Sequence, residues 1–535
     1  MGFRRHDPPA ALLFGYDPVR DLPPDHLARL IEMVVEEALA PKLGPVEPGQ
    51  PKFDPRLCAK VLIYGYSTGV RSSRQLERHC AESLPYLFLT RGDTPSYRTL
   101  CSFRVQQSEL LEEVFVALFS LAGECGMKRL GRIVVDSSKF RADASPDSVV
   151  RQSEYEPVLA ELKRILEEAQ EADLRDEEEP VGQTQTGVPA DKVAPEQMRE
   201  ILRRIRCKKG EKVPDSPDTT LLGPRMRPRI EAAIDAIEEA RKEDRKHACL
   251  TDPDARMMGE GREKPVRECH SFEVAVDAQD GLLVAAASTN IGTDNSRLSG
   301  LVEAAQQTIQ RADPAGREGV TAVDADSGYY SGSTVAELIG KGIDTCIPDS
   351  NTACDLHRGH PIGTTRRKTQ GSVALVYDPE ADCYRCPEGN ILTPRQTREQ
   401  HGQVVMTYRA RHTCAGCPLA SMCLTQPNAK RRTLKVGKDH QVLEAARQQF
   451  SEPGQVERYR HRAEAVETIF GFLRSALGFH RWSLRGNERV ACEARLFKLA
   501  YQFRKVCIAY MTALEGQNVA LSQTHNPNRV HHRAV

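Results

Sequence analysis

Two short runs of β-branched residues, each carrying aspartate, most constrain how this chain folds. The first, RIVVDSSKF, begins at Arg132 and places Asp136 after its apolar residues. The second, GVTAVDADSGYYSG, begins at Gly319 and carries Asp324 and Asp326. Such runs are typical of buried strands in a sheet that is covered on both faces. An aspartate that ends a buried strand either caps the next turn or projects into a site, and each run alone leaves both readings open.

The segments around these runs predict a mixed sheet flanked by helices. Alternating residues 272–278 and 282–289, joined by a Gln-Asp-Gly turn, predict a β-hairpin. A helix is expected over 296–312, a second over 333–341 and a strand over 342–347. Strand, hairpin, helix, strand, helix, strand, with an acidic helix late in the chain, is the element order of an RNase H-like α/β fold. The RNase H-like core is predicted to consist of three parts of the chain, at 127–149, 265–350 and 441–512.

The late helix lies in Tyr459–Gly486. Its apolar side chains recur at helical spacing, and a different face carries Arg460, Glu464, Glu467 and Arg474. Alone, this pattern indicates an amphipathic helix whose exposed face is crossed by ion pairs. A reading as a catalytic helix depends on the two upstream aspartate runs.

Four further regions complete the predicted organisation. Residues 1–126 are expected to form an all-α DNA-binding domain, in which a short helix carries Arg98 and Arg104 after a turn. Residues 150–264 are expected to form an insertion, a hairpin of two polar helices with a disordered linker. Residues 351–440 form a small cysteine-rich insertion, and 513–535 a disordered tail.

Five of the 16 cysteines are grouped, whereas most others are scattered. They form two CxxC pairs and a fifth thiol: Cys383, Cys386, Cys414, Cys417 and Cys423. Paired thiols at this spacing predict one structural Zn²⁺. The spacing leaves open which four would bind, with His412, His357 and His360 as other candidates. Reduced cysteines without metal and an iron–sulfur cluster are the alternatives.

Charge and hydropathy restrict the partners and the location. The chain has 74 basic and 74 acidic residues, so its net charge indicates no partner. From 455 to 508, however, basic residues outnumber acidic ones, which suits a polyanion. No run of eighteen apolar residues and no signal-like N-terminus are present. We therefore expect no membrane association and a cytoplasmic, nucleoid-associated bacterial protein.

Asp136, Asp326 and Glu467 are the candidate metal ligands. Carboxylates without Cys or His in the set favour Mg²⁺ or Mn²⁺. Two such ions would activate an attacking oxygen and stabilise the leaving oxygen of a phosphodiester displacement.

The sequence resembles insertion-sequence transposases of the DDE class. The resemblance rests on GYSTGVRSSRQLERH (65–79), TPSYRTLCSFR (94–104), VVDSSKFRADAS (134–145), ADSGYYS (325–331), the cysteine group and the stretch 459–486. It implies that the catalytic acids are Asp136, Asp326 rather than Asp324, and Glu467 rather than Glu464. The family's Tyr and Arg ahead of this Glu correspond to Tyr459 and Arg462, and its basic residue seven positions after the Glu corresponds to Arg474. Ser137-Ser138 replaces the Gly-Thr common after the first Asp, and Arg474 replaces the usual Lys.

The expected function is that of a Mg²⁺-dependent DNA transposase. It would bind terminal inverted repeats, hydrolyse phosphodiester bonds and join the freed ends to target DNA. The family resemblance implies that it does so as a homodimer. The predicted DNA contacts are Lys139, Arg98, Arg104, Arg462, Arg474, Arg485 and Tyr459. The alternatives are a metal-dependent nuclease without strand transfer and a domesticated, non-catalytic DNA-binding protein.

Overall fold

A computed structural model describes residues 17–42, 53–127, 131–178, 227–259, 265–292, 297–313, 319–360, 373, 375–400, 403–424, 426 and 428–524. The first two ranges contain only helices: α1 (Pro18–Asp21), α2 (Leu27–Leu39), η1 (Ala40–Lys42), α3 (Pro55–Ser67), α4 (Ser73–Glu82), α5 (Leu84–Thr90), α6 (Tyr97–Gln106) and α7 (Ser108–Glu124). The start of α3 agrees with its sequence, because the Asp54 carboxylate caps the helix by accepting from the Arg56 amide and Pro55 occupies the first position.

A six-stranded mixed sheet follows. Its strands are β1 (Arg132–Arg141), β4 (Arg256–Gly259), β5 (Val266–Asp277), β6 (Leu283–Thr289), β7 (Ala322–Ala325) and β8 (Asp344–Cys346). The order is β4-β5-β1-β7-β8, with β6 paired to β5. Strands β1, β7 and β8 are parallel, whereas β5 is antiparallel to β1. Between strands lie η5 (Ser327–Tyr329), α11 (Leu298–Ala312) and α12 (Gly332–Gly340), and α13 (Ser350–Arg358) follows the sheet.

One boundary differs from the sequence prediction. Asp136 was expected at the end of its strand, but β1 continues to Arg141. The reason is that the two neighbours of β1 have different lengths: pairing with β7 ends at Val135, whereas pairing with β5 continues to Arg141. Asp136 therefore lies where one neighbouring strand stops and the other goes on.

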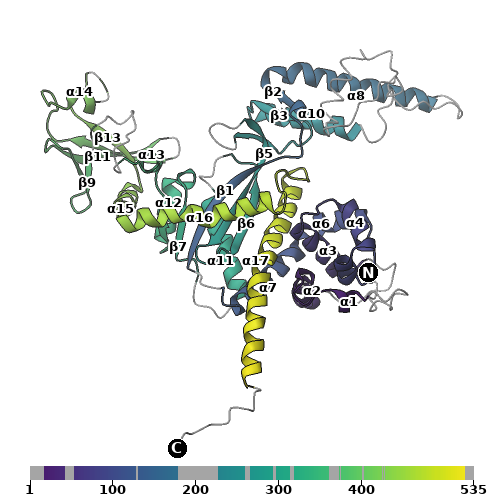
Figure 1. The fold of residues 1–535 in the computed structure, drawn as a ribbon. Helices are drawn as coiled ribbons and strands as arrows, with labels where there is room; N and C mark the ends of the chain where they lie inside the picture. The colour runs from purple at the N-terminus through teal and green to yellow at the C-terminus, as the bar shows by residue number, and fades with distance from the viewer. Residues whose placement is uncertain are drawn as a thin grey trace, which may run out of the picture.

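Three helices end the chain: α15 (His440–Phe450), α16 (Pro453–Ser475) and α17 (Asn487–Thr524). Figure 1 shows α16 running across the sheet and α17 passing between the sheet and the N-terminal helices. Helix α17 contacts β6 as well as α3 and α7, so it joins these two parts of the molecule. Helix α17 continues to Thr524, past residue 513, from which a disordered tail was predicted. Residues 525–535 lie outside the described ranges.

The insertion after β1 has its own core. Strands β2 (Val149–Arg151) and β3 (His247–Cys249) form its base beside η2 (Pro146–Ser148) and η3 (Gln152–Glu154). Helices α8 (Tyr155–Glu178) and α10 (Arg227–Lys242) pack through a cluster that includes Leu162, Ile165 and Ile237. The predicted linker lies outside the described residues.

The cysteine-rich region is a five-stranded antiparallel sheet. Its strands are β9 (Val376–Asp378), β10 (Cys383–Arg385), β11 (Ile391–Gln400), β12 (Gln403–Ala410) and β13 (Thr433–Gly437), with α14 (Ala420–Cys423) between the last two. Its core includes Tyr384, Leu392, Tyr408 and Leu434. In Figure 1 this sheet lies beyond α15, away from the N-terminal helices.

No helix in the described parts of the chain is long and apolar enough to cross a membrane.

Candidate active site and cysteine cavity

The register of β1 and β7 places Asp136 beside Asp326. The last pair of these parallel strands is Val135 with Ala325, and each aspartate is the next residue. Since paired residues of neighbouring strands project from the same face, both carboxylates project from one face of the sheet. The negative charge of Asp326 helps to raise the pKa of Asp136, which agrees with this proximity.

Two arginines on α16 fix this helix over the same face. Arg458 Nη2 lies 2.5 Å from Asp324 Oδ1, and Arg462 Nη1 lies 3.2 Å from Asp136 Oδ2. Arg458 also pairs with Asp344 on β8. Four helical residues rise about 6 Å, close to the roughly 6.6 Å between alternate residues of a strand. The spacing of the two arginines thus matches two successive rows of carboxylates on the sheet.

The structure gives Asp324 and Asp326 different surroundings. Asp324 is fully buried and contacts both Arg458 and Arg132. Asp326 is partly exposed, and its Oδ1 accepts a 2.8 Å hydrogen bond from the Gly328 amide. Asp324 is therefore part of a buried ion network, whereas Asp326 is accessible to a ligand.

Asp136 is the acid whose ionisation the fold perturbs most clearly. Burial raises its pKa to about 6, the Arg462 guanidinium opposes this rise, and the Asp326 carboxylate adds to it. The side chain is 22% exposed. Carboxylates that repel one another in a partly buried site are a suitable environment for a cation, because a cation would remove both penalties.

This raised pKa predicts a pH-dependent stability change in Asp136→Asn. The cost of ionising Asp136 in the folded state is absent below about pH 4, increases as the pH rises to 6 and is complete above 6. Without divalent metal at pH 7.5, the free energy of unfolding of Asp136→Asn is expected to be about 1–3 kcal/mol higher than that of the unmodified protein. The difference should disappear near pH 4.

Denaturant unfolding at both pH values measures this, with Asp235→Asn on the exposed side of α10 as the matched control. A variant that is equally stable at both pH values, or less stable at pH 7.5, would contradict the assigned environment of Asp136.

Glu467 is on α16 but is not in contact with the two aspartates. Its side chain is exposed, and it lies seven residues before Arg474, on nearly the same side of the helix. Arg474 faces β1, where it donates to the Ser138 hydroxyl and lies 4.8 Å from the centre of the Phe140 ring. Glu464 lies farther round the helix and interacts with His461. Glu467 is thus the nearer of the two glutamates to the sheet.

The described residues contain no three His, Cys, Asp or Glu side chains close enough together to hold a metal ion. The structure therefore brings Asp136 and Asp326 together, and leaves Glu467 at the edge of the same site.

The predicted DNA contacts have different positions. Tyr459 is partly exposed beside Arg462, whose guanidinium lies 5.2 Å from the centre of its ring. Arg485 pairs with Asp143, and Arg98 is exposed on α6. Lys139 lies three residues after Asp136, so strand alternation places it on the opposite face of the sheet.

The prediction for Arg104 is wrong for this structure. Arg104 is only 3% exposed, and its guanidinium donates to the Tyr66 hydroxyl and the Ser73 hydroxyl. Arg104 thus connects α3, α4 and α6 inside the helical region and is not available to DNA.

Two site-building residues were missed in the sequence. Arg458 could have been found from its spacing, because it precedes Arg462 by one helical turn. Glu493 is fully buried on α17, and its carboxylate accepts from the Ser483 and Leu484 amides at 2.8 and 3.1 Å. It holds the segment after α16 in place, but no sequence signal distinguished it from other helical glutamates.

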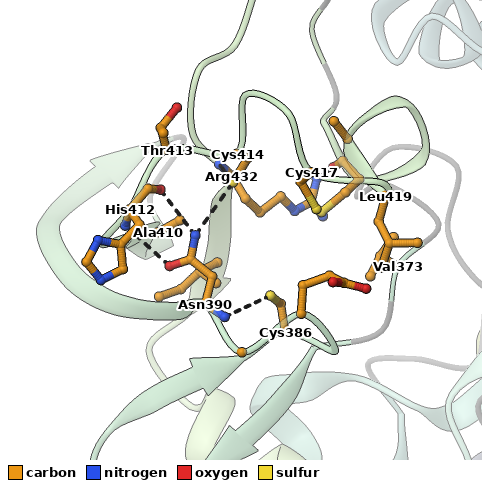
Figure 2. Close-up of a pocket in the computed structure, with 15 residues that line it drawn as sticks. Val373, Cys386, Asn390, Ala410, His412, Thr413, Cys414, Cys417, Leu419 and Arg432 are labelled. Atoms are coloured by element: carbon orange, nitrogen blue, oxygen red, sulfur yellow. Dashed lines mark hydrogen bonds between the residues drawn. The ribbon is translucent and has the colours of Figure 1, made fainter.

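Four of the five grouped cysteines line one cavity of about 250 Å³: Cys386, Cys414, Cys417 and Cys423. Figure 2 shows Cys386, Cys414 and Cys417 around this cavity, with Asn390 between the first two. Cys423 lies near enough to the other three for their thiols to affect its pKa, which burial raises. Cys383 is buried on β10 and does not line the cavity.

Two tight turns shape the cavity. Gly389 after Cys386 and Gly416 between Cys414 and Cys417 have φ of 77° and 85°, which favour glycine. Sulfur accepts from backbone amides at both turns: Asn390 N donates to Cys386 Sγ at 3.2 Å, and Arg432 N donates to Cys414 Sγ at 3.4 Å. These amides would stabilise thiolates.

Comparison with known families gives two matches. Residues 385–507 match a transposase DDE domain, and residues 17–106 match a transposase domain, DUF772. No curated protein matches the chain. The first match includes Glu467 and the four cavity cysteines, and the second covers helices α1 to α6, whereas Asp136 and Asp326 lie outside both.

Both matched families are transposase families, and the two matches lie at separate places in the chain. The matches confirm the resemblance to insertion-sequence transposases of the DDE class.

Proposed function

We propose that this transposase binds the terminal inverted repeats of its own element, hydrolyses phosphodiester bonds there and joins the freed 3′ ends to target DNA. The observation that carries the proposal is the register of β1 and β7, which sets Asp136 level with Asp326 beneath the helix that carries Glu467. The helices of residues 53–126 would help to recognise the ends. Two copies would act together, because a synapse contains two ends.

The proposed fold of the catalytic core is RNase H-like. Support comes from the sheet order, in which β6-β5-β1 is an antiparallel meander and β1-β7-β8 is parallel. Helix α16 packs across β1 and β7, so the last catalytic acid would come from a helix after the sheet. In this fold the ends of adjacent central strands are where a site would form.

The chemistry of the donor set fits hard divalent cations. Asp136, Asp326 and Glu467 would hold two Mg²⁺ or Mn²⁺ ions, which supply activation of the attacking oxygen and stabilisation of the leaving oxygen. Arg462 neutralises Asp136 and would turn to a DNA phosphate when the acids hold cations. Arg474 beside Ser138 would contact the same strand of DNA. Movement of Glu467 toward the aspartates is required, since it is exposed at the edge of the site.

The test incubates the protein with labelled element-end duplex, Mg²⁺ and supercoiled plasmid. We expect plasmid joined to the labelled 3′ strand, and no product in the presence of a chelator. Cleaved ends without joining would favour the nuclease, and binding without cleavage would favour a non-catalytic DNA-binding protein. Either result would contradict the proposed strand-transfer activity.

We also propose that Cys386, Cys414, Cys417 and Cys423 hold one structural Zn²⁺. Support comes from their shared cavity, from the two glycine turns and from the amide donors to sulfur. Their thiols would have to approach one another by side-chain rotation, because they are too widely spaced as described. Cys383 would not take part.

Metal analysis of the purified protein is expected to give about one zinc per chain. Cys414→Ser should lose most of that zinc and unfold the five-stranded sheet at a lower temperature, whereas Cys383→Ser should retain the zinc. Protein without zinc, or equal zinc in the two variants, would contradict the four-cysteine site.

A further inference from the structure

A basic region of the chain lies on the cysteine-rich sheet, outside the candidate active site. Between residues 391 and 438 the only acid is Glu399, against nine basic residues: Arg395, Arg398, Arg409, Arg411, Lys430, Arg431, Arg432, Lys435 and Lys438. A local excess of about eight positive charges creates a strong field that attracts polyanions.

Strand register divides these residues between two faces. One face carries the core, with Leu392, Tyr408 and Leu434. On the other face, Thr393, Arg409 and Thr433 form one row, Gln396, Thr407 and Lys435 the next, and Arg398, Val405 and Gly437 the third. We call this the outer face. Its three cations, Arg398, Arg409 and Lys435, are all exposed.

The outer-face cations have no carboxylate partner among the described residues. Arg385, at the other end of the sheet, differs because it pairs with Asp378 at 2.8 Å. Because no carboxylate offsets their positive charge, these side chains can attract an external anion.

The spacing of these cations fits an extended anion. Arg398, Arg409 and Lys435 lie on three neighbouring strands, which extend over about 10 Å. One small anion cannot contact all three, whereas successive phosphates of a nucleic acid backbone can. Besides Val405 and Gly437, their neighbours on the outer face are threonine and glutamine, whose polar groups also hydrogen-bond phosphates.

We propose that the outer face of the five-stranded sheet binds duplex DNA through its phosphates, without reading the base sequence. The inference rests on the proposed DNA function, and it adds a second contact region that the catalytic acids do not include. The sheet lies beyond α15 in Figure 1, so this contact would extend the bound DNA away from the N-terminal helices.

The test measures binding of a 40-base-pair duplex of random sequence by fluorescence anisotropy over a series of KCl concentrations, without divalent metal. The triple variant Arg398→Gln, Arg409→Gln, Lys435→Gln is compared with a control of equal charge change on exposed residues of the insertion, Arg229→Gln, Lys242→Gln, Lys246→Gln. Each lost phosphate contact lowers the slope of log K against log salt by about 0.9.

We expect the outer-face variant to lose about two to three units of that slope and at least about tenfold in affinity, while the control changes little. Equal effects of the two variants, or an unchanged slope in the outer-face variant, would overturn the proposal. Because the assay needs neither cleavage nor element sequence, it can fail while strand joining succeeds. Zinc content and circular dichroism of both variants show whether the sheet remains folded. If the triple variant does not fold, the single variant Lys435→Gln replaces it, with an expected loss of about one unit of slope.

Discussion

Arg458→Met is expected to lower the free energy of unfolding by roughly 3–5 kcal/mol, because it leaves a buried carboxylate without its main partner. Asp324 is fully buried, and Arg458 is its closest cation at 2.5 Å. Arg132 remains, but its Nε is 3.5 Å from the other carboxylate oxygen and its side chain is 39% exposed. Methionine keeps most of the side-chain volume and removes only the charge and its hydrogen bonds.

The matched control is Arg460→Met, two residues later on the same helix, where the side chain is exposed. Its effect should remain within about 0.5 kcal/mol. Chemical denaturation of both variants gives the comparison. If Arg458→Met were as stable as the control, the ion network could not be what fixes α16 on the sheet.

Asp136→Asn and Asp326→Asn are expected to reduce strand joining by about 100- to 1,000-fold or more, the scale expected when a group that stabilises developing charge is removed. Both variants remove charge at the site where β1 and β7 diverge, and neither removes much volume. Glu467→Gln should have an effect of similar size, because its carboxylate would complete the ligand set.

Glu464→Gln is the control for the helix, since Glu464 is exposed on the same helix and its carboxylate interacts with His461. It should retain joining within about twofold. Joining that survives in Asp136→Asn or Asp326→Asn would remove these acids from the catalytic site, and equal losses in the two glutamate variants would remove the distinction between them.

The sequence was sufficient for the main elements of the sheet, because their signals are local. The hairpin of β5 and β6, the helix α11 and the strand β7 follow from alternation, turn chemistry and β-branched runs. Asp136 could be selected from the apolar run before it, whereas the choice of Asp326 over Asp324 came from the family resemblance.

The parts that sequence reasoning missed depend on pairing between distant segments. The extension of β1 past Asp136 is set by the longer partner β5, and the burial of Arg104 by Tyr66 on another helix. The difference between Asp324 and Asp326 likewise depends on Arg458, more than 130 residues away. Spacing within one segment carries no information on such partners.

The most direct test of the account counts the Mn²⁺ ions that bind to the zinc-loaded protein with element-end DNA, by electron paramagnetic resonance. The double variant Asp136→Asn, Asp326→Asn with the same DNA provides the background. We expect about two Mn²⁺ per chain above that background. An equal count in the unmodified protein and the double variant would contradict a metal-dependent site at Asp136 and Asp326.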